Sequence, residues 1–183
     1  MPKNLPNYLT IIRIIFVPII FSLIIEDNYL IAFIVFTISS FTDIADGIIA
    51  RKFNLITDWG KLMDPLADKL TQISTLSALS IRDVIPFWIL IVVTIKEISM
   101  ICGAFFLYKK EIVTVQSKWY GKAATVILYI AIVLSLLSIK FTFLAKFNIY
   151  IYYLALSMTV FAGIMYAQKF LIVNTSKENK KLN

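Results

Sequence analysis

The sequence predicts an all-α integral membrane protein with six transmembrane helices and both termini in the cytoplasm. Three observations support this fold class: the composition, a series of apolar runs joined by short connectors, and the uneven distribution of positive charge. Of 183 residues, 60% are hydrophobic and 16% are charged, whereas a soluble domain has roughly 45–50% apolar and about 25% charged residues. So few charged side chains cannot cover the surface of a soluble fold, and we expect lipid to surround much of the chain.

A helix that spans a bilayer needs about 20 mostly apolar residues. Six runs meet this requirement, at residues 8–26, 29–50, 61–81, 84–107, 121–139 and 147–172. Helices are expected because lipid offers the backbone no hydrogen-bond partners. The first run contains Arg13, lacks a small-x-small cleavage site and is followed at once by further spans, which argues against a signal peptide. We therefore expect one membrane domain at 1–173 and a polar cytoplasmic tail at 174–183.

The connectors alternate between the two sides of the membrane. Residues 26–28, 82–83 and 140–146 lie on one side, and residues 51–60 and 109–118 lie on the other side with both termini. Of the 18 lysines and arginines, most fall on or near the terminal side. The exceptions are Arg82, Lys140 and Lys146 on the opposite side and Lys96 within the fourth run. Because cytoplasmic loops carry an excess of lysine and arginine, the termini are predicted to be cytoplasmic.

Composition also excludes several function classes. The chain has one cysteine and no histidine, so an internal disulfide is impossible and a zinc site is not expected. The net charge of +7 is scattered between apolar runs and forms no single basic face, so we expect contact with anionic membrane lipids and no nucleic acid.

Four aspartates lie within or beside the apolar runs, at Asp43, Asp46, Asp64 and Asp68. An aspartate at the centre of a spanning helix costs about 2.5–3.5 kcal/mol, and four unpaired ones would cost on the order of 10 kcal/mol. The neighbouring lysines and arginine are too few and too peripheral to neutralise all four carboxylates. A bound divalent cation is the better explanation.

The spacing of these residues supports a shared site. Asp43, Asp46, Gly47, Ala50 and Arg51 occupy positions i, i+3, i+4, i+7 and i+8, which form one face of a helix. The small residues leave room beside the carboxylates for a flat group close to the backbone.

The next run continues the pattern. Gly60, Asp64 and Asp68 occupy i, i+4 and i+8, so the two faces can converge if the helices are antiparallel neighbours. An all-oxygen ligand set suits a hard cation, Mg²⁺ or Mn²⁺, which completes its coordination with substrate phosphates.

These eight fixed positions within residues 43–68 resemble the signature of the CDP-alcohol phosphatidyltransferase family. The segments 4–13 and 64–69 are also similar to the bacterial phosphatidylglycerophosphate synthases of that family. The resemblance implies that Asp43, Asp46 and Asp64 hold metal, and that Asp68 is the base on the acceptor hydroxyl and also contacts metal.

Further expectations follow from the same resemblance. Gly47, Ala50 and Gly60 would make room for the cytidine of a CDP-lipid, and Arg51 would lie beside its diphosphate. The expected donor is CDP-diacylglycerol, the expected assembly is a homodimer in the cell membrane, and the active site would face the cytoplasm.

The acceptor alcohol is less closely determined by the sequence. Glycerol 3-phosphate is favoured, with Lys118, Lys122 and Arg13 as candidate acceptor-binding residues because its phosphate needs cations. A cardiolipin-type synthase with phosphatidylglycerol as acceptor comes second, because the segment 117–125 resembles both enzyme types and Lys96 departs from the arginine of both. The sequence is also compatible with a CDP-alcohol phosphatidyltransferase for a different acceptor and, more remotely, with a small ion transporter.

Overall fold

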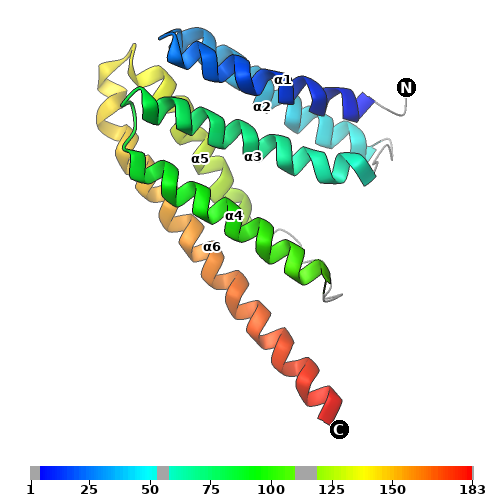
Figure 1. The fold of residues 1–183 in the computed structure, drawn as a ribbon. Coiled ribbons are helices and arrows are strands. Elements are labelled where there is room, and N and C mark those ends of the chain that lie inside the picture. Colours follow the sequence, from blue (N-terminus) through cyan, green and yellow to red (C-terminus); the bar gives the residue numbers. More distant parts are fainter. Residues whose placement is uncertain (1–4, 53–57, 110–118, 183) are drawn as a thin grey trace.

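The computed structural model describes residues 5–52, 58–109 and 119–182, and in these residues the chain forms six α-helices and no strand (Figure 1). Their bounds are α1 Leu5–Ile25, α2 Tyr29–Lys52, α3 Asp58–Ile81, α4 Phe87–Lys109, α5 Trp119–Ser138 and α6 Thr142–Leu182. The prediction of an all-helical chain is confirmed, and each helix overlaps one of the six apolar runs.

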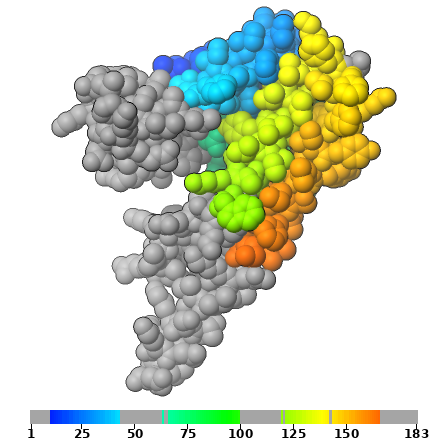
Figure 2. Space-filling view, turned by 180° about the vertical axis from the view of Figure 1, so that it is seen from behind, coloured from blue at the N-terminus to red at the C-terminus, as the bar shows by residue number. Residues whose placement is uncertain are grey.

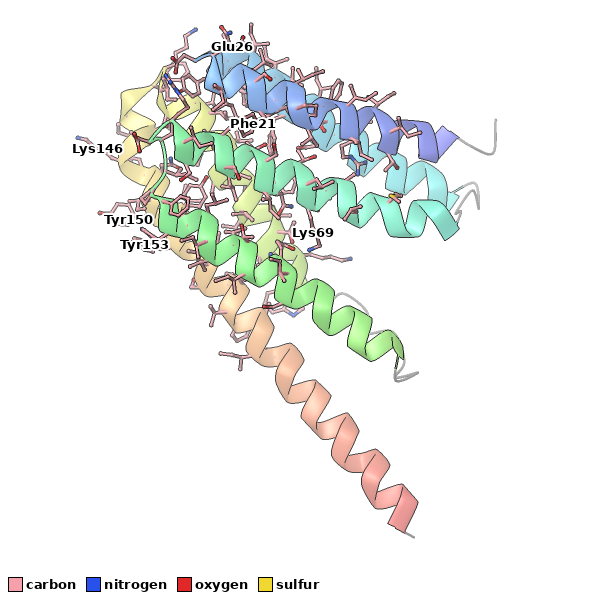
Figure 3. The ribbon with its side chains drawn as sticks, in the orientation of Figure 1. Phe21, Glu26, Lys69, Lys146, Tyr150 and Tyr153 are labelled. Carbon is pink, nitrogen blue, oxygen red and sulfur yellow. The ribbon has the colours of Figure 1, made fainter. Side chains whose placement is uncertain are left out.

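Successive helices run in alternating directions (Figure 1). The connectors after α1, α3 and α5 lie at one end of the bundle, which we call the connector end, and both termini lie toward the opposite side. Figure 3 places Glu26 and Lys146 at the connector end. The alternation agrees with the sidedness predicted from the charges.

Helix α1 packs against α2 and α3, and α3 in turn packs against α4 and α5. Helix α5 packs along α6 and also contacts α2. Figure 2 shows α5 and the first half of α6 side by side from behind, with α2 next to α5. Helix α3 therefore contacts α1, α4 and α5, which matters because α3 carries Asp68.

The ends of α1 and α3 share one backbone motif. Asp27 and Asp83 have φ values of 63° and 56°, a left-handed conformation that aspartate adopts more readily than most residues. After α1, the backbone N–H of Asn28 donates to the carbonyl of Leu23 at 2.8 Å. After α3, Val84 donates in the same way to a carbonyl of the last turn, at 2.9 Å. These bonds satisfy carbonyls that a helix end otherwise leaves unpaired.

The two turns are also joined by their side chains. The guanidinium of Arg82 forms an ion pair with the carboxylate of Asp27, and the hydroxyl of Tyr29 donates to the same carboxylate at 2.9 Å. The hydrogen bonds from Tyr29 and Arg82 hold the pKa of Asp27 below its ordinary value of 3.8. The α1–α2 and α3–α4 connectors are thus linked at the connector end.

The described side chains bury an apolar core and leave many large apolar side chains on the outside. The core includes Ile24, Phe36, Leu76, Leu79, Ile132 and Tyr152. Ile15, Phe41, Phe87 and Tyr150 are among the exposed ones. An exterior of this kind is expected where lipid, and not water, surrounds the helices.

Among the described residues, two helical segments are long and apolar enough to cross a membrane, Gly121–Ser138 of α5 and Phe143–Met165 of α6. Shorter apolar stretches occur at Thr10–Ile25 in α1 and Tyr29–Thr42 in α2. These segments fit a membrane protein, and the number of crossings stays a prediction.

Helix α6 is longer than the apolar run that predicts it. It extends to Leu182 and so continues through most of the segment expected as a polar tail. The sequence of 166–182 contains neither glycine nor proline, so no helix-breaking residue interrupts the backbone where the apolar run ends.

Candidate functional site

Asp68 lies on α3, and side chains from two helices hold its carboxylate. The hydroxyl of Tyr129 on α5 donates a hydrogen bond to Asp68 Oδ1. Gln72, one turn further along α3, donates from Nε2 to Asp68 Oδ2 at 3.3 Å. Among the described side chains, each carboxylate oxygen therefore has one donor, and each keeps a further lone pair for another partner.

Arg13 on α1 is buried, with only 2% of its surface exposed. Its positive charge acts on the Asp68 carboxylate, as does that of Lys69. Because α1 packs directly on α3, the first helix contributes a cation to the surroundings of Asp68. The expected role of Arg13 in binding the acceptor stays a prediction.

A buried carboxylate on α4 lies between two lysines. Glu97, whose side chain is 3% exposed, forms ion pairs with Lys69 of α3 and with its own neighbour Lys96. Figure 3 shows Lys69 between α3 and α4. The Lys69 ammonium is thus engaged by Glu97, which leaves it less available to neutralise the aspartates.

The remaining three aspartates lie on helical backbone. Asp43 and Asp46 are in the second half of α2, and Asp64 is in the second turn of α3. Gly47, Ala50, Arg51 and Gly60 are also at helical positions. The regular helix keeps each spacing on one face, as predicted, and the side chains of these seven residues lie outside those that the structure describes.

Of the two lysines expected to bind the acceptor, the structure describes Lys122. Lys122 is exposed in the first turn of α5, on the helix that also carries Tyr129. Lys118 lies outside the described residues.

The donor set fits a hard divalent cation. Asp68 offers carboxylate oxygens with free lone pairs, and Asp64 stands one helical turn before it on α3. Among the side chains that the structure describes, no three histidine, cysteine, aspartate or glutamate residues cluster, which follows from the position of three of the four aspartates outside that set. Four carboxylates without nitrogen or sulfur ligands suit Mg²⁺ or Mn²⁺.

Sequence reasoning missed three residues beside Asp68 and Lys69. Gln72 continues the i, i+4 series of Asp64 and Asp68, and this spacing together with a polar amide in an apolar run could have revealed it. Tyr129 and Glu97 stand 61 and 28 positions away from their partners. No local pattern predicts such contacts, because they depend on how α3, α4 and α5 pack.

The sequence of the chain matches the model of one protein family. The family described as CDP-alcohol phosphatidyltransferase matches residues 3–165, which include every described residue of the site.

Individual relatives carry two kinds of name. A "CDP-diacylglycerol--glycerol-3-phosphate 3-phosphatidyltransferase" of Rickettsia typhi is 52% identical over 71 residues, 37% of this chain and 40% of that protein. A protein of the same name from Aquifex aeolicus is 34% identical over 138 residues, 74% of this chain and 75% of that protein. A "Cardiolipin synthase (CMP-forming)" of Streptomyces coelicolor is 34% identical over 143 residues, 74% of this chain and 66% of that protein. The match thus spans about 40% of the length of the Rickettsia relative and more of the Aquifex and Streptomyces proteins.

Proposed function

The chain belongs to the CDP-alcohol phosphatidyltransferase family, and we propose that it transfers a phosphatidyl group from CDP-diacylglycerol to glycerol 3-phosphate. The products are phosphatidylglycerophosphate and CMP. The observation that carries this proposal is the family match over residues 3–165 together with relatives named for that reaction, one of which aligns with 74% of the chain.

The site supplies the parts that this reaction needs. The acceptor hydroxyl attacks the phosphorus that bears the diacylglycerol, and a new O–P bond forms. The bond from that phosphorus to the bridging oxygen of the diphosphate breaks, and this oxygen leaves as part of CMP. Asp68 accepts the proton of the attacking hydroxyl, a role that general-base catalysis assigns to a group within hydrogen-bond reach of it. Tyr129 and Gln72 contact the same carboxylate and orient it.

A divalent cation, Mg²⁺ or Mn²⁺, is part of the proposal. Asp43, Asp46, Asp64 and Asp68 would hold it, and it would neutralise the diphosphate and make CMP a better leaving group. Gly47, Ala50 and Gly60 would leave space for the cytidine, and Arg51 would bind near the diphosphate. Arg13, Lys118 and Lys122 are the cations proposed for the acceptor phosphate.

The arrangement in the membrane is also proposed. All six helices cross the bilayer, residues 1–173 form the membrane domain, and both termini and the active site face the cytoplasm. The alternating direction of the helices and the concentration of lysines and arginines on the terminal side support this. A homodimer in contact with membrane lipids is the proposed assembly.

The purified protein, reconstituted with CDP-diacylglycerol and millimolar Mg²⁺, tests the function directly. Each acceptor is added separately, CMP is quantified, and the lipid product is identified by mass spectrometry. We expect phosphatidylglycerophosphate with glycerol 3-phosphate. Cardiolipin formed from phosphatidylglycerol, with no reaction of glycerol 3-phosphate, would instead support the activity for which the Streptomyces relative is named.

A further inference from the structure

We propose that Tyr129 is a positioning residue for the transfer reaction, because its hydroxyl fixes the Asp68 carboxylate in the orientation that receives the acceptor's proton. The inference rests on the proposed function and adds to it a residue from α5 that the aspartate signature does not contain. Tyr129 acts through Asp68 and is not itself assigned a contact with substrate.

The contact joins two helices that are far apart in sequence. Tyr129 of α5 donates its hydroxyl hydrogen to Oδ1 of Asp68 of α3, 61 positions away. A hydrogen bond to a carboxylate is charge-assisted and stronger than one between neutral groups. The second donor to Asp68, Gln72, lies on the same helix and reaches Oδ2 at 3.3 Å, beyond the usual range for an N–H···O bond. Tyr129 therefore provides the restraint that comes from across the helix interface.

The tyrosine ring is itself held in place. It packs against Phe36 of α2, with ring centroids 5.5 Å apart and planes inclined at 36°. Six residues further along α5, the buried Ser135 hydroxyl lies 2.9 Å from that of Tyr152 and donates to Asn148 Oδ1 at 3.1 Å. The Phe36 contact thus holds the Tyr129 ring against α2, whereas the Ser135 contacts join α5 to α6.

Holding the base matters because proton transfer requires a specific geometry. A carboxylate that can rotate away from the acceptor loses reactive encounters even when both substrates are bound. Removing the Tyr129 hydroxyl would leave Oδ1 without this donor, and among the described side chains Gln72 would be the remaining hydrogen-bond donor to the carboxylate. The turnover number should then fall while substrate affinity is kept.

The test compares Tyr129→Phe with Tyr152→Phe. Both variants lose one tyrosine hydroxyl, and both keep the aromatic ring. The Tyr152 hydroxyl bonds to Ser135 at the α5–α6 interface and not to Asp68, so it serves as the matched control. In wild-type and variant protein in mixed micelles with Mg²⁺, kcat and the KM values for CDP-diacylglycerol and glycerol 3-phosphate are measured. Thermal unfolding is recorded in parallel.

We expect kcat of Tyr129→Phe to fall roughly ten- to a hundredfold, the range that one charge-assisted hydrogen bond supports. Both KM values should stay within about twofold of wild type. Tyr152→Phe should lower the melting temperature and keep kcat within about twofold. The positioning role is contradicted if kcat of Tyr129→Phe is unchanged, or if its KM values rise in proportion to the loss of kcat.

A second variant keeps the test decisive if Tyr129→Phe does not fold. Gln72→Met removes the second donor to Asp68 with little change in volume, and we expect kcat to fall about three- to tenfold at constant KM. An unchanged kcat in this variant would then overturn the proposal. Wild-type protein that releases no CMP with any acceptor would refute the proposed function itself, whereas active wild type with an unaffected Tyr129→Phe variant refutes only the positioning role.

Discussion

At the scale of single residues, the carboxylates of Asp68 and Glu97 have different kinds of hydrogen-bond partner. Asp68 receives hydrogen bonds from neutral donors, Tyr129 and Gln72, while Glu97 takes the ammonium groups of Lys69 and Lys96. Adjacent residues of α3, Asp68 and Lys69, therefore do not neutralise each other directly. The carboxylate at 68 stays available to a proton or a cation, and the one at 97 links α3 to α4.

The variant Glu97→Gln tests whether the ion pairs of Glu97 with Lys69 and Lys96 stabilise the contact between α3 and α4. The substitution leaves two lysines without their carboxylate, which for a fully buried pair costs about 3–5 kcal/mol. The lysine side chains are 20% and 16% exposed, so a smaller loss is expected. The melting temperature of Glu97→Gln in detergent should be clearly lower than that of wild type. Lys96→Gln should lower it by a smaller amount, because Lys69 still pairs with Glu97 in that variant. Equal melting temperatures of wild type and Glu97→Gln would show that the ion pairs do not stabilise the α3–α4 contact.

Asp68→Asn tests the role of the base. The amide cannot accept the hydroxyl proton, so CMP release should fall by at least about a hundredfold, while CDP-diacylglycerol still binds with near-wild-type affinity in a titration. Asp83→Asn is the matched control, since Asp83 is exposed at the connector end and asparagine also adopts its left-handed conformation. Loss of CDP-lipid binding in Asp68→Asn would instead identify Asp68 mainly as a metal ligand.

At the scale of helices and turns, the connector end is organised by Asp27, which both ends α1 and pairs with Arg82. Its pKa is lowered in the folded protein, first by the hydrogen bond from Tyr29 and then by that from Arg82. A carboxylate with a lowered pKa stabilises the fold above its unfolded pKa, and this contribution is lost as pH falls through the folded pKa.

Asp27→Asn is therefore expected to lower the melting temperature slightly at pH 7. The difference from wild type should shrink as pH falls below about 4, where the wild-type carboxyl of the unfolded chain begins to protonate. Asparagine keeps the left-handed backbone conformation and one acceptor oxygen, so the variant removes the charge and one of the two oxygens that Arg82 contacts. A difference that stays constant from pH 7 down to pH 3 would contradict an electrostatic origin.

The helices were predictable because each is an apolar run of sufficient length, and the connectors because each is short and polar. The extension of α6 beyond residue 172 was not predicted, because the apolar run ends while the backbone helix continues. Asp68 was predicted from its spacing to Asp64, whereas its partner Tyr129 was not, because one tyrosine within the apolar α5 run carries no periodic signal. Contacts between helices depend on packing, and a single sequence does not record which faces meet.

At the scale of the whole molecule, the proposed topology places the connector end and the termini on opposite sides of the membrane. Exposed aromatic residues at the connector end fit a membrane–water interface, among them Trp88 and Tyr153, which stack with centroids 5.7 Å apart. Figure 3 shows Tyr150 and Tyr153 on α6 near this end, close to Lys146.

Cysteine labelling measures that topology. In a Cys102→Ser background, Glu26→Cys and Lys177→Cys are introduced singly, and a membrane-impermeant maleimide is applied to intact cells and to inverted vesicles. Glu26→Cys should react in cells and Lys177→Cys only in inverted vesicles. Reaction of both positions from the same side would contradict the proposed placement of the connector end and the C-terminus on opposite sides.

The most direct test of the central claim is the incorporation of labelled glycerol 3-phosphate into lipid. Purified wild-type protein in liposomes containing CDP-diacylglycerol and Mg²⁺ should transfer the label to the organic phase, with one CMP released for each label incorporated. The Asp64→Asn variant, which loses one carboxylate of the proposed metal site, should incorporate at least about a hundredfold less. Label that stays in the aqueous phase while wild-type protein releases CMP would contradict glycerol 3-phosphate as the acceptor, and equal incorporation by Asp64→Asn would contradict the aspartate site.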